Sequence, residues 1–364
     1  MSDPTGGVRP SRAQRSDQVQ RRWRTQAAVI TVIVAAILIA VIVTRSGDDG
    51  GSGASPTVST STSATAGPGA LLALSVTGAP NALLATVGSG EGLPSAALVL
   101  PPDLTVTMPG SGEVLTEQLQ ELPGASMRVG VSNADGAWND HFAVMELERF
   151  AGVVDRLGGL TVDLQDVYAV GDDVLGPGDT HLTGEQLTAL LSEDADDTAA
   201  RWASVLGAFL ASVPNLSPTD FAETDDAPAA AEILGAGETG VEIAPTQIVG
   251  GSALIPAQPD FDQLMSQLFA TTTPRRAEVR NGNGQPGVGE AVGEQLIPAG
   301  FRIVLSDNAD SFDHQTTDII AAGTENEPAA QDAKRAIGVG KVIVSQVPSG
   351  LADVTIVVGK DYHA

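Results

Sequence analysis

Cysteine is absent from the 364-residue chain, and aromatic residues make up only 4% of it. Without cysteine the chain has neither disulfides nor thiolate metal ligands, so its stability must come from packed apolar cores. The shortage of aromatic rings argues against a stacking platform for single-stranded nucleic acid. The four histidines are scattered without the i, i+4 spacing of a zinc-binding helix. No serine has the sequence context of a nucleophile elbow.

Positive charge is also scarce: 19 Lys and Arg stand against 45 Asp and Glu, for a net charge of −26. The first 26 residues hold six arginines and two acids, a net of +4, which leaves −30 on the rest of the chain. A region this acidic is not expected to bind nucleic acid or an anionic membrane surface directly. Its carboxylates could hold divalent cations, but we favour a solvated acidic surface for most of them.

One long apolar run interrupts this polar composition. Ala27–Thr44 contains no charged residue, Pro or Gly, and as a helix it would span about 27 Å, close to the hydrocarbon thickness of a bilayer. The arginines before it favour a cytoplasmic N-terminus, with the chain beyond Arg45 outside. A cleaved signal peptide and a buried core helix are the alternatives. The length of the run and the lack of a small-x-small cleavage site favour an uncleaved signal anchor.

Composition and apolar patterning divide the chain into five parts. These are a cytoplasmic Arg-rich tail (1–26), a transmembrane signal anchor (27–44), a Ser/Thr/Gly linker (45–69), a first α/β domain (70–270) and a second, small α/β domain (275–362). The linker contains almost nothing that could form a core, so we expect a flexible tether.

In the first domain, short apolar runs predict strands, and apolar residues three and four apart predict helices. The predicted strands are 71–76, 81–87, 95–101, 141–147, 160–164 and 241–249, and the predicted helices are 113–122, 148–157, 183–191, 198–213 and 261–269. Strand 141–147, helix 148–157 and strand 160–164 form a βαβ pattern, so we expect a mixed, partly parallel sheet. Segment 214–240 shows no clear pattern.

The second domain is predicted to be a compact α/β unit. The predicted strands are 277–281, 301–307, 316–323, 341–347 and 352–361, and the predicted helices are 288–296 and 327–338. This part of the chain resembles the LytR C-terminal domain family. The matching motifs, in the family's order, are Val279-Arg280-Asn281-Gly282-Asn283-Gly284, then Gly287, Ala299-Gly300-Phe301, and Val357-Val358-Gly359-Lys360-Asp361.

The middle of the chain, about Leu71–Phe269, resembles the LytR-CpsA-Psr (LCP) domain. The similarity is clearest at Asp140-His141-Phe142, at Phe150–Val162 and at Leu182–Gln186. Active members of this family are transferases that move a polymer from a polyprenyl-pyrophosphate carrier to peptidoglycan. The resemblance therefore implies an α/β/α domain with a mixed sheet, and a polyprenyl phosphate lipid or a cell-wall polymer as its partner.

The catalytic motifs of that family are largely lost here. The Pro-Arg-Asp motif is Pro101-Pro102-Asp103, the acid before the second strand is Asn81, the Arg-x-Arg pair is replaced within Leu191-Ser192-Glu193-Asp194, and the last motif keeps only Asp196 or Asp197 with Arg201. Forked arginine donors hold a pyrophosphate in such a site. Each lost charge-assisted contact is worth roughly 1.5–3 kcal/mol, so three losses could lower transition-state binding several thousandfold, ~5 kcal/mol or more.

These losses predict a degenerate domain that binds without catalysing transfer. The competing hypothesis is an active glycopolymer–peptidoglycan ligase in which Arg128, Arg149 and Arg156 replace the missing arginines. A third hypothesis is a purely structural protein that contacts envelope-assembly partners.

Asp103, Arg201, Asp196 and Asp197 are the candidate binding residues carried over from the family. In the functional interpretation Asp103 helps to hold Mg²⁺ and Arg201 touches a phosphate. In the structural interpretation, which we favour, Asp103 caps a turn and Arg201 pairs with neighbouring acids. The acids around Asp196 and Asp197 lack the spacing of an EF-hand loop, which favours a solvated turn.

A Gly-rich loop precedes the first helix of the second domain and contains Asn281, Gly282, Gly284 and Gly287. A helix start of this kind can bind phosphate through free N–H groups. The loop matches neither a Walker motif nor the dinucleotide-binding fingerprint, so we favour a tight structural turn. Taken together, the sequence predicts a membrane-anchored, extracytoplasmic cell-envelope protein that binds a polyprenyl-linked or cell-wall polymer.

Overall fold

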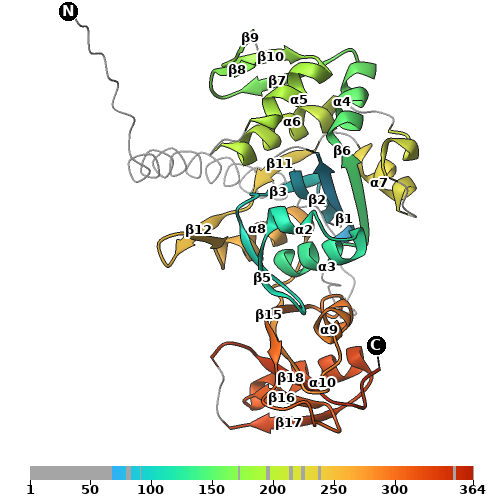
Figure 1. The fold of residues 1–364 in the computed structure, drawn as a ribbon, viewed down its shortest axis with the longest axis vertical. Helices are drawn as coiled ribbons and strands as arrows, with labels where there is room; N and C mark the ends of the chain where they lie inside the picture. The colour runs from blue at the N-terminus through green and yellow to red at the C-terminus, as the bar shows by residue number, and fades with distance from the viewer. Residues whose placement is uncertain are drawn as a thin grey trace, which may run out of the picture. The chain divides into compact units, whose positions relative to one another are not determined.

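A computed structural model describes most of the chain after residue 67 (Figure 1). The described residues are 68–78, 83–90, 92–170, 173–193, 197–212, 216–222, 226–236, 239–346 and 350–363. The predicted tail and signal anchor lie outside them, as do residues 45–67 of the linker, so these remain predictions. Within the described ranges, no helix is both long and apolar enough to cross a bilayer.

Both domains contain strands and helices. The strands are β1 (Pro68–Thr77), β2 (Leu83–Gly90), β3 (Ala96–Leu100), β4 (Thr105–Met108), β5 (Gly112–Leu115), β6 (His141–Glu146), β7 (Leu160–Leu164), β8 (Tyr168–Val170), β9 (Asp173–Leu175), β10 (Gly178–Leu182), β11 (Gly240–Ile243), β12 (Thr246–Val249), β13 (Ala253–Pro256), β14 (Arg275–Asn281), β15 (Phe301–Asn308), β16 (Asp318–Ala322), β17 (Lys341–Ser345) and β18 (Val354–Val358). The helices are α2 (Thr116–Leu119), α3 (Gly124–Asp135), α4 (Leu147–Arg156), α5 (Gly184–Ser192), α6 (Thr198–Ser212), α7 (Ala227–Leu234), α8 (Asp260–Phe269), α9 (Val288–Leu296) and α10 (Glu327–Ile337), with short 3-10 turns at Pro218–Asp220 and Thr324–Asn326.

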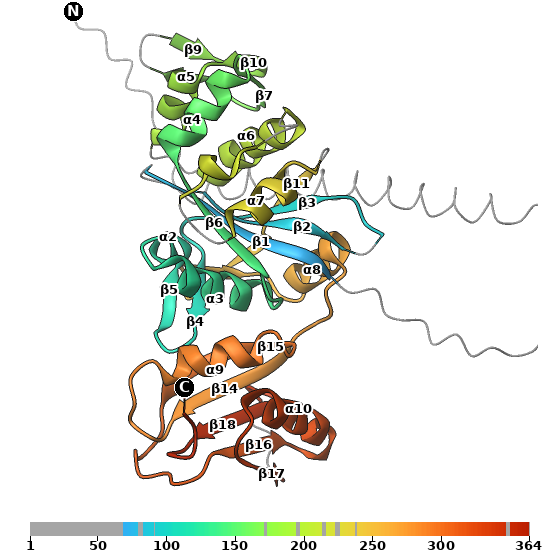
Figure 2. The ribbon, with the colours of Figure 1, turned by 90° about the vertical axis from the view of Figure 1, so that its right-hand side faces the viewer.

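The first domain is built on a five-stranded mixed sheet in the order β11-β3-β2-β1-β6. The pairs β1–β2 and β2–β3 are antiparallel, whereas β1–β6 and β3–β11 are parallel. Consecutive β1 residues such as Leu71 and Leu72 are fully buried, because helices cover both faces of the sheet. Figure 2 shows α4, α6 and α7 on one side of this sheet and α3 and α8 on the other. The predicted mixed α/β/α arrangement is therefore observed.

The predicted βαβ unit is wrong in its second strand. β6 joins the central sheet, but β7 pairs antiparallel with β10 in a separate two-stranded sheet. The residues of β7 alternate strictly between buried and exposed. This alternation is typical of a strand with one solvated face and not of a central parallel strand, which would be buried on both faces.

The predicted helix 113–122 is also wrong over its first half. Its first residues form strand β5, which pairs with β4, and only the short helix α2 follows. Gly110 and Gly112 take positive φ values at this hairpin, a conformation that glycine adopts without strain. Helix α3 was not predicted, because small and polar residues such as Ser132 and Asn133 occupy its buried positions.

The second domain has a five-stranded sheet in the order β15-β14-β18-β16-β17. The neighbours β14, β15 and β18 are parallel to one another, β16 is antiparallel to β18, and β17 is parallel to β16. Helices α9 and α10 contact each other and pack on one face of this sheet, where the apolar core includes Val279, Phe301 and Ile356. All of the predicted elements of this domain are confirmed.

Candidate functional site

Arg201 lies in the first turn of α6 and is almost completely enclosed by protein groups. Its side chain is 8% exposed, and its Nε lies 2.9 Å from Asp197 Oδ1. Its Nη1 donates to Leu190 O at 3.0 Å and lies 3.5 Å from Glu193 Oε2. The guanidinium group also stacks over the ring of Tyr168. Its charge is therefore largely neutralised by protein groups around it.

Tyr168 completes this cluster by donating its hydroxyl to Asp197 Oδ2 at 2.8 Å. Burial, followed by the neighbouring Asp197 carboxylate, raises the pKa of Tyr168 to about 12. Asp197 thus accepts from a tyrosine and pairs with an arginine at the same time. Asp196 lies outside the described residues, so its role remains a prediction.

Asp103 is exposed in the turn between β3 and β4. The turn is closed by Leu104 N donating to Pro101 O, and the Thr116 hydroxyl donates to the same carbonyl. Within the described residues, no hydrogen bond or ion pair joins Asp103 to Arg201, and no group of three or more His, Asp or Glu is arranged to hold a metal ion. The structure thus brings Arg201 and Asp197 into direct contact, whereas Asp103 has no hydrogen bond or ion pair to either of them within the described residues.

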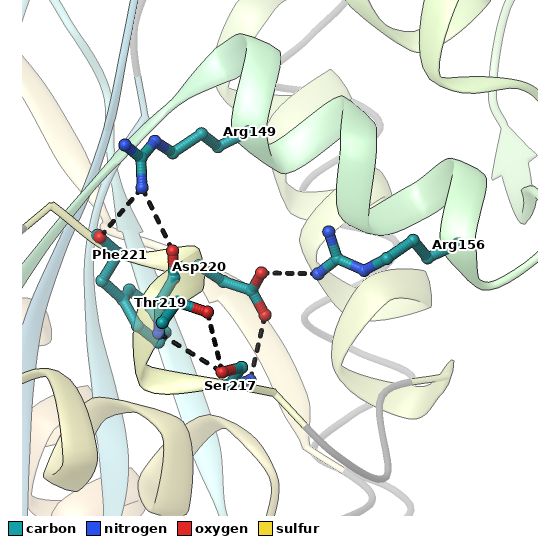
Figure 3. Close-up of polar contacts among 6 residues, drawn as sticks. All are labelled: Arg149, Arg156, Ser217, Thr219, Asp220 and Phe221. Atoms are coloured by element: carbon teal, nitrogen blue, oxygen red, sulfur yellow. Dashed lines mark hydrogen bonds and ion pairs between the residues drawn. The ribbon is translucent and has the colours of Figure 1, made fainter.

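Arg149 and Arg156, two of the possible substitutes, extend from α4 to the turn before α7 (Figure 3). Arg149 Nη1 donates to the carbonyls of Thr219 and Phe221 at 3.1 and 3.3 Å. Arg156 Nη2 donates to Asp220 Oδ1 at 2.5 Å, and the other oxygen of that carboxylate accepts from the backbone of Ser217. Both arginines therefore fasten a loop to a helix.

Arg128, the third substitute, lies over the rings of Trp138 and Phe142. Its Nη1 donates to Asp140 O at 3.2 Å. The neighbouring His141 Nδ1 lies 3.0 Å from Asp226 Oδ1. Asp140 in turn accepts from the backbone of Leu71. The Asp-His-Phe motif thus ties β6 to β1 and to the start of α7.

Asp135, at the end of α3, was not singled out from the sequence. It is 1% exposed, and its Oδ2 accepts from the Thr86 hydroxyl at 2.5 Å and from Asn139 Nδ2 at 2.9 Å. Burial raises the pKa of Asp135 to about 6, although these two hydrogen bonds oppose the shift. Its Oδ1 has no hydrogen-bond partner among the described residues. The only feature of the sequence that could have indicated this buried acid is its position as the last residue of a helix made of small residues.

The Gly-rich loop forms a turn closed by its own side chains. Asn281 Oδ1 accepts from the backbone N–H groups of Asn283 and Gly284, and Asn281 Nδ2 donates to Gln285 O. Gly282 is bonded to the backbone of Val358. Gly284 and Gly287 both take positive φ values, and Gly287 is the N-cap of α9. These contacts agree with the interpretation of a structural turn.

Comparison with known proteins identifies the second domain directly. Residues 276–362 match the LytR_C family model, described as LytR cell envelope-related transcriptional attenuator. This match confirms the resemblance found in the motifs of that domain. No curated protein sequence matches the chain.

Several solved structures are similar to the chain. One is the LytR-Csp2A-Psr enzyme from Actinomyces oris, with 18% identity, a TM-score of 0.44, and coverage of 57% of this chain and 91% of that chain. B. subtilis TagT has 17% identity, a TM-score of 0.45, and coverage of 55% and 89%. The family protein YwtF (TagT) with bound octaprenyl pyrophosphate lipid has 16% identity, a TM-score of 0.45, and coverage of 56% and 90%. Similarity this low assigns neither a family, an activity nor a ligand to the chain.

Proposed function

We propose that this chain is a cell-envelope protein that binds a polyprenyl-linked or cell-wall polymer without transferring it. The observation that carries the proposal is the state of Arg201. It is the one arginine retained from the family motif, and Asp197, Glu193 and the carbonyl of Leu190 already surround its guanidinium group. A diphosphate at this position would have to displace two carboxylates or lie beside them, and either arrangement is electrostatically unfavourable.

The possible substitutes support the same conclusion. Arg149 and Arg156 bind the loop before α7, and Arg128 lies over two aromatic rings. Releasing Arg156 would leave Asp220, with 9% exposure, without its ion-pair partner, and removing one partner of a largely buried pair is costly.

The envelope assignment rests on the LytR_C domain, whose family description is envelope-related. In the proposed arrangement, the run at 27–44 anchors the protein and its N-terminus is cytoplasmic. Residues 45–69 tether the two α/β domains outside the membrane, where they meet the polymer.

Binding is tested with the full-length protein in lipid nanodiscs. The probe is a polyprenyl-diphosphate-linked oligosaccharide, and polyprenyl monophosphate is the comparison ligand. We expect saturable binding of the oligosaccharide, with affinity unchanged within about twofold in Arg201→Ala. Thermal unfolding of the variant shows whether it remains folded, and Arg201→Lys keeps the charge if it does not. No binding of the lipid-linked oligosaccharide would refute the proposed function. A loss of affinity in folded Arg201→Ala would show that this arginine contacts the phosphate.

A further inference from the structure

The sheet of the LytR_C domain has a cavity on the face opposite α9 and α10. Its volume is about 260 Å³. It is lined by Glu278 and Arg280 on β14, Thr355 and Val357 on β18, Ile320 and Ala322 on β16, and Ser345 at the end of β17. The same face continues along β17 through Lys341 and Ile343, which are exposed. Four strands of the domain therefore contribute to one concave surface that is open to solvent.

The polar groups of the cavity are centred on a buried carboxylate. Glu278 is 3% exposed, and its Oε1 accepts from Arg280 Nε at 2.8 Å and lies 2.7 Å from Arg280 Nη2. Thr355 Oγ1 donates to Glu278 Oε2 at 2.9 Å. The Arg280 side chain is 41% exposed, and its Nη1 has no hydrogen bond to a protein group among the described residues. The cavity thus offers unused donors next to partly used carboxylate and hydroxyl acceptors.

The charges of this lining select against ionic ligands. The Glu278 and Arg280 charges cancel, so the lining has no net charge. An anion bound to Arg280 would lie next to the buried Glu278 carboxylate, and a cation bound to Glu278 would lie next to the guanidinium group. Each arrangement places like charges together or breaks a paired group that is largely desolvated. The favoured ligand is therefore neutral.

A neutral ligand for this site must also present several hydroxyl groups and an apolar face. Adjacent hydroxyls can accept from Arg280 and donate to Glu278, whereas Val357 and Ala322 offer apolar surface to C–H groups. Pockets for drug-sized ligands usually measure roughly 300–1,000 Å³, so this smaller cavity suits a single ring. We propose that the cavity binds one neutral sugar ring of the polymer. This inference rests on the proposed function and gives the LytR_C domain the role of glycan recognition.

The test measures binding of soluble neutral glycans to the full-length protein by isothermal titration calorimetry. The probes are maltotriose and the N-acetylglucosamine trimer, and the galacturonic acid trimer is the charged comparison. We expect at least one neutral trisaccharide to bind and the uronate to bind more than tenfold more weakly. Thr355→Val removes one hydroxyl from the lining and should weaken binding about tenfold. Ala322→Leu fills the cavity and should abolish binding.

Ile343→Ala is the matched control, because Ile343 lies on the same face but does not line the cavity. Its affinity should equal that of the parent protein, and thermal unfolding should show that all three variants are folded. Failure of both neutral trisaccharides to bind would overturn the inference. Equal binding of the uronate, or unchanged binding by a folded Ala322→Leu variant, would overturn it as well.

The lipid-linked oligosaccharide is titrated into the same preparation so that the two proposals can fail separately. If it binds while neither neutral trisaccharide does, the sugar site is refuted and the proposed function stands. If a trisaccharide binds and the lipid-linked oligosaccharide does not, the proposed function is refuted and the cavity remains a glycan site.

Discussion

Asn133 of α3 pairs with the backbone of Ile303 on β15 as a neighbouring strand would. Its Nδ2 donates to Ile303 O at 2.9 Å, and its Oδ1 accepts from Ile303 N at 2.7 Å. The same Nδ2 donates to Thr107 O at 2.8 Å. β15 is an edge strand of the second sheet, so one side-chain amide satisfies edge groups that are buried between the two domains.

Asn133→Ala should destabilise the protein by about 2–4 kcal/mol. The substitution leaves the N–H and C=O of Ile303 buried without partners, and each such group costs about 1–3 kcal/mol. Urea unfolding of the full-length protein measures the change. Asn308→Ala, at an exposed position of β15, is the control and should stay within about 0.5 kcal/mol of the parent. Equal stabilities of the two variants would show that the amide pairing contributes nothing.

Arg302 holds the same interface through three groups of the first domain. Its Nε and Nη2 donate to the carbonyls of Asn133 and Ala134, and its Nη1 donates to Asp262 Oδ1 at 2.7 Å. Both side chains of the ion pair are almost buried. Arg302→Met should lower the free energy of unfolding by about 3–5 kcal/mol, because the Asp262 carboxylate loses its partner. Arg302→Met combined with Asp262→Leu should recover part of this loss, and a double variant no more stable than Arg302→Met would contradict this explanation.

Asp135 should make stability depend on pH. Its folded pKa of about 6 lies above the unfolded value of 3.8, so between these values the folded state binds more protons and stability falls as pH rises. In Asp135→Asn this contribution is absent. Relative to the parent, the variant should gain up to about 3 kcal/mol between pH 4 and pH 7. Unfolding in urea at several pH values checks the gain. A difference in stability between Asp135→Asn and the parent that stays constant with pH would contradict the raised pKa.

Two helical glycines should respond in opposite directions to the same substitution. A Cβ on Gly152 of α4 meets no atom within 4 Å, so Gly152→Ala should stabilise the protein by about 0.5–1 kcal/mol. A Cβ on Gly289 of α9 would lie 2.6 Å from the Cα of Gly110. Gly289→Ala should therefore destabilise the protein despite its better helix propensity. Thermal melts compare the variants, and stabilisation by both would contradict the close approach of α9 to the β4–β5 hairpin.

Strands and helices could be predicted from the sequence where the spacing of apolar residues fitted only one of the two. Each strand and helix predicted in the second domain is present, because each apolar run there belongs to one strand or one helix. The capping box at Thr183 correctly marked the start of α5, where the Thr183 side chain accepts from Gln186 N. The prediction failed at β5, where Val114 and Leu115 fit either period, and at β7, whose alternation was read as part of a parallel unit.

The contacts of the candidate site could be predicted only in part. The loss of family arginines is visible in the sequence, and so are the acids next to Arg201. The pairing of Asn133 with Ile303 joins residues 170 positions apart, and no local pattern reports such a distance. The cavity of the second domain could not be predicted from the sequence either. Its lining comes from four strands, and only the folded sheet defines their order.

A transfer assay tests the central claim most directly. Full-length protein in nanodiscs is mixed with Mg²⁺, peptidoglycan and a polyprenyl-diphosphate-linked oligosaccharide labelled in its sugar. The labelled oligosaccharide should bind to the protein. It should stay on its lipid carrier, because Asp197 and Glu193 already neutralise Arg201. The account would be contradicted if label appeared in peptidoglycan faster with the protein than without it, and if Arg201→Ala abolished this transfer.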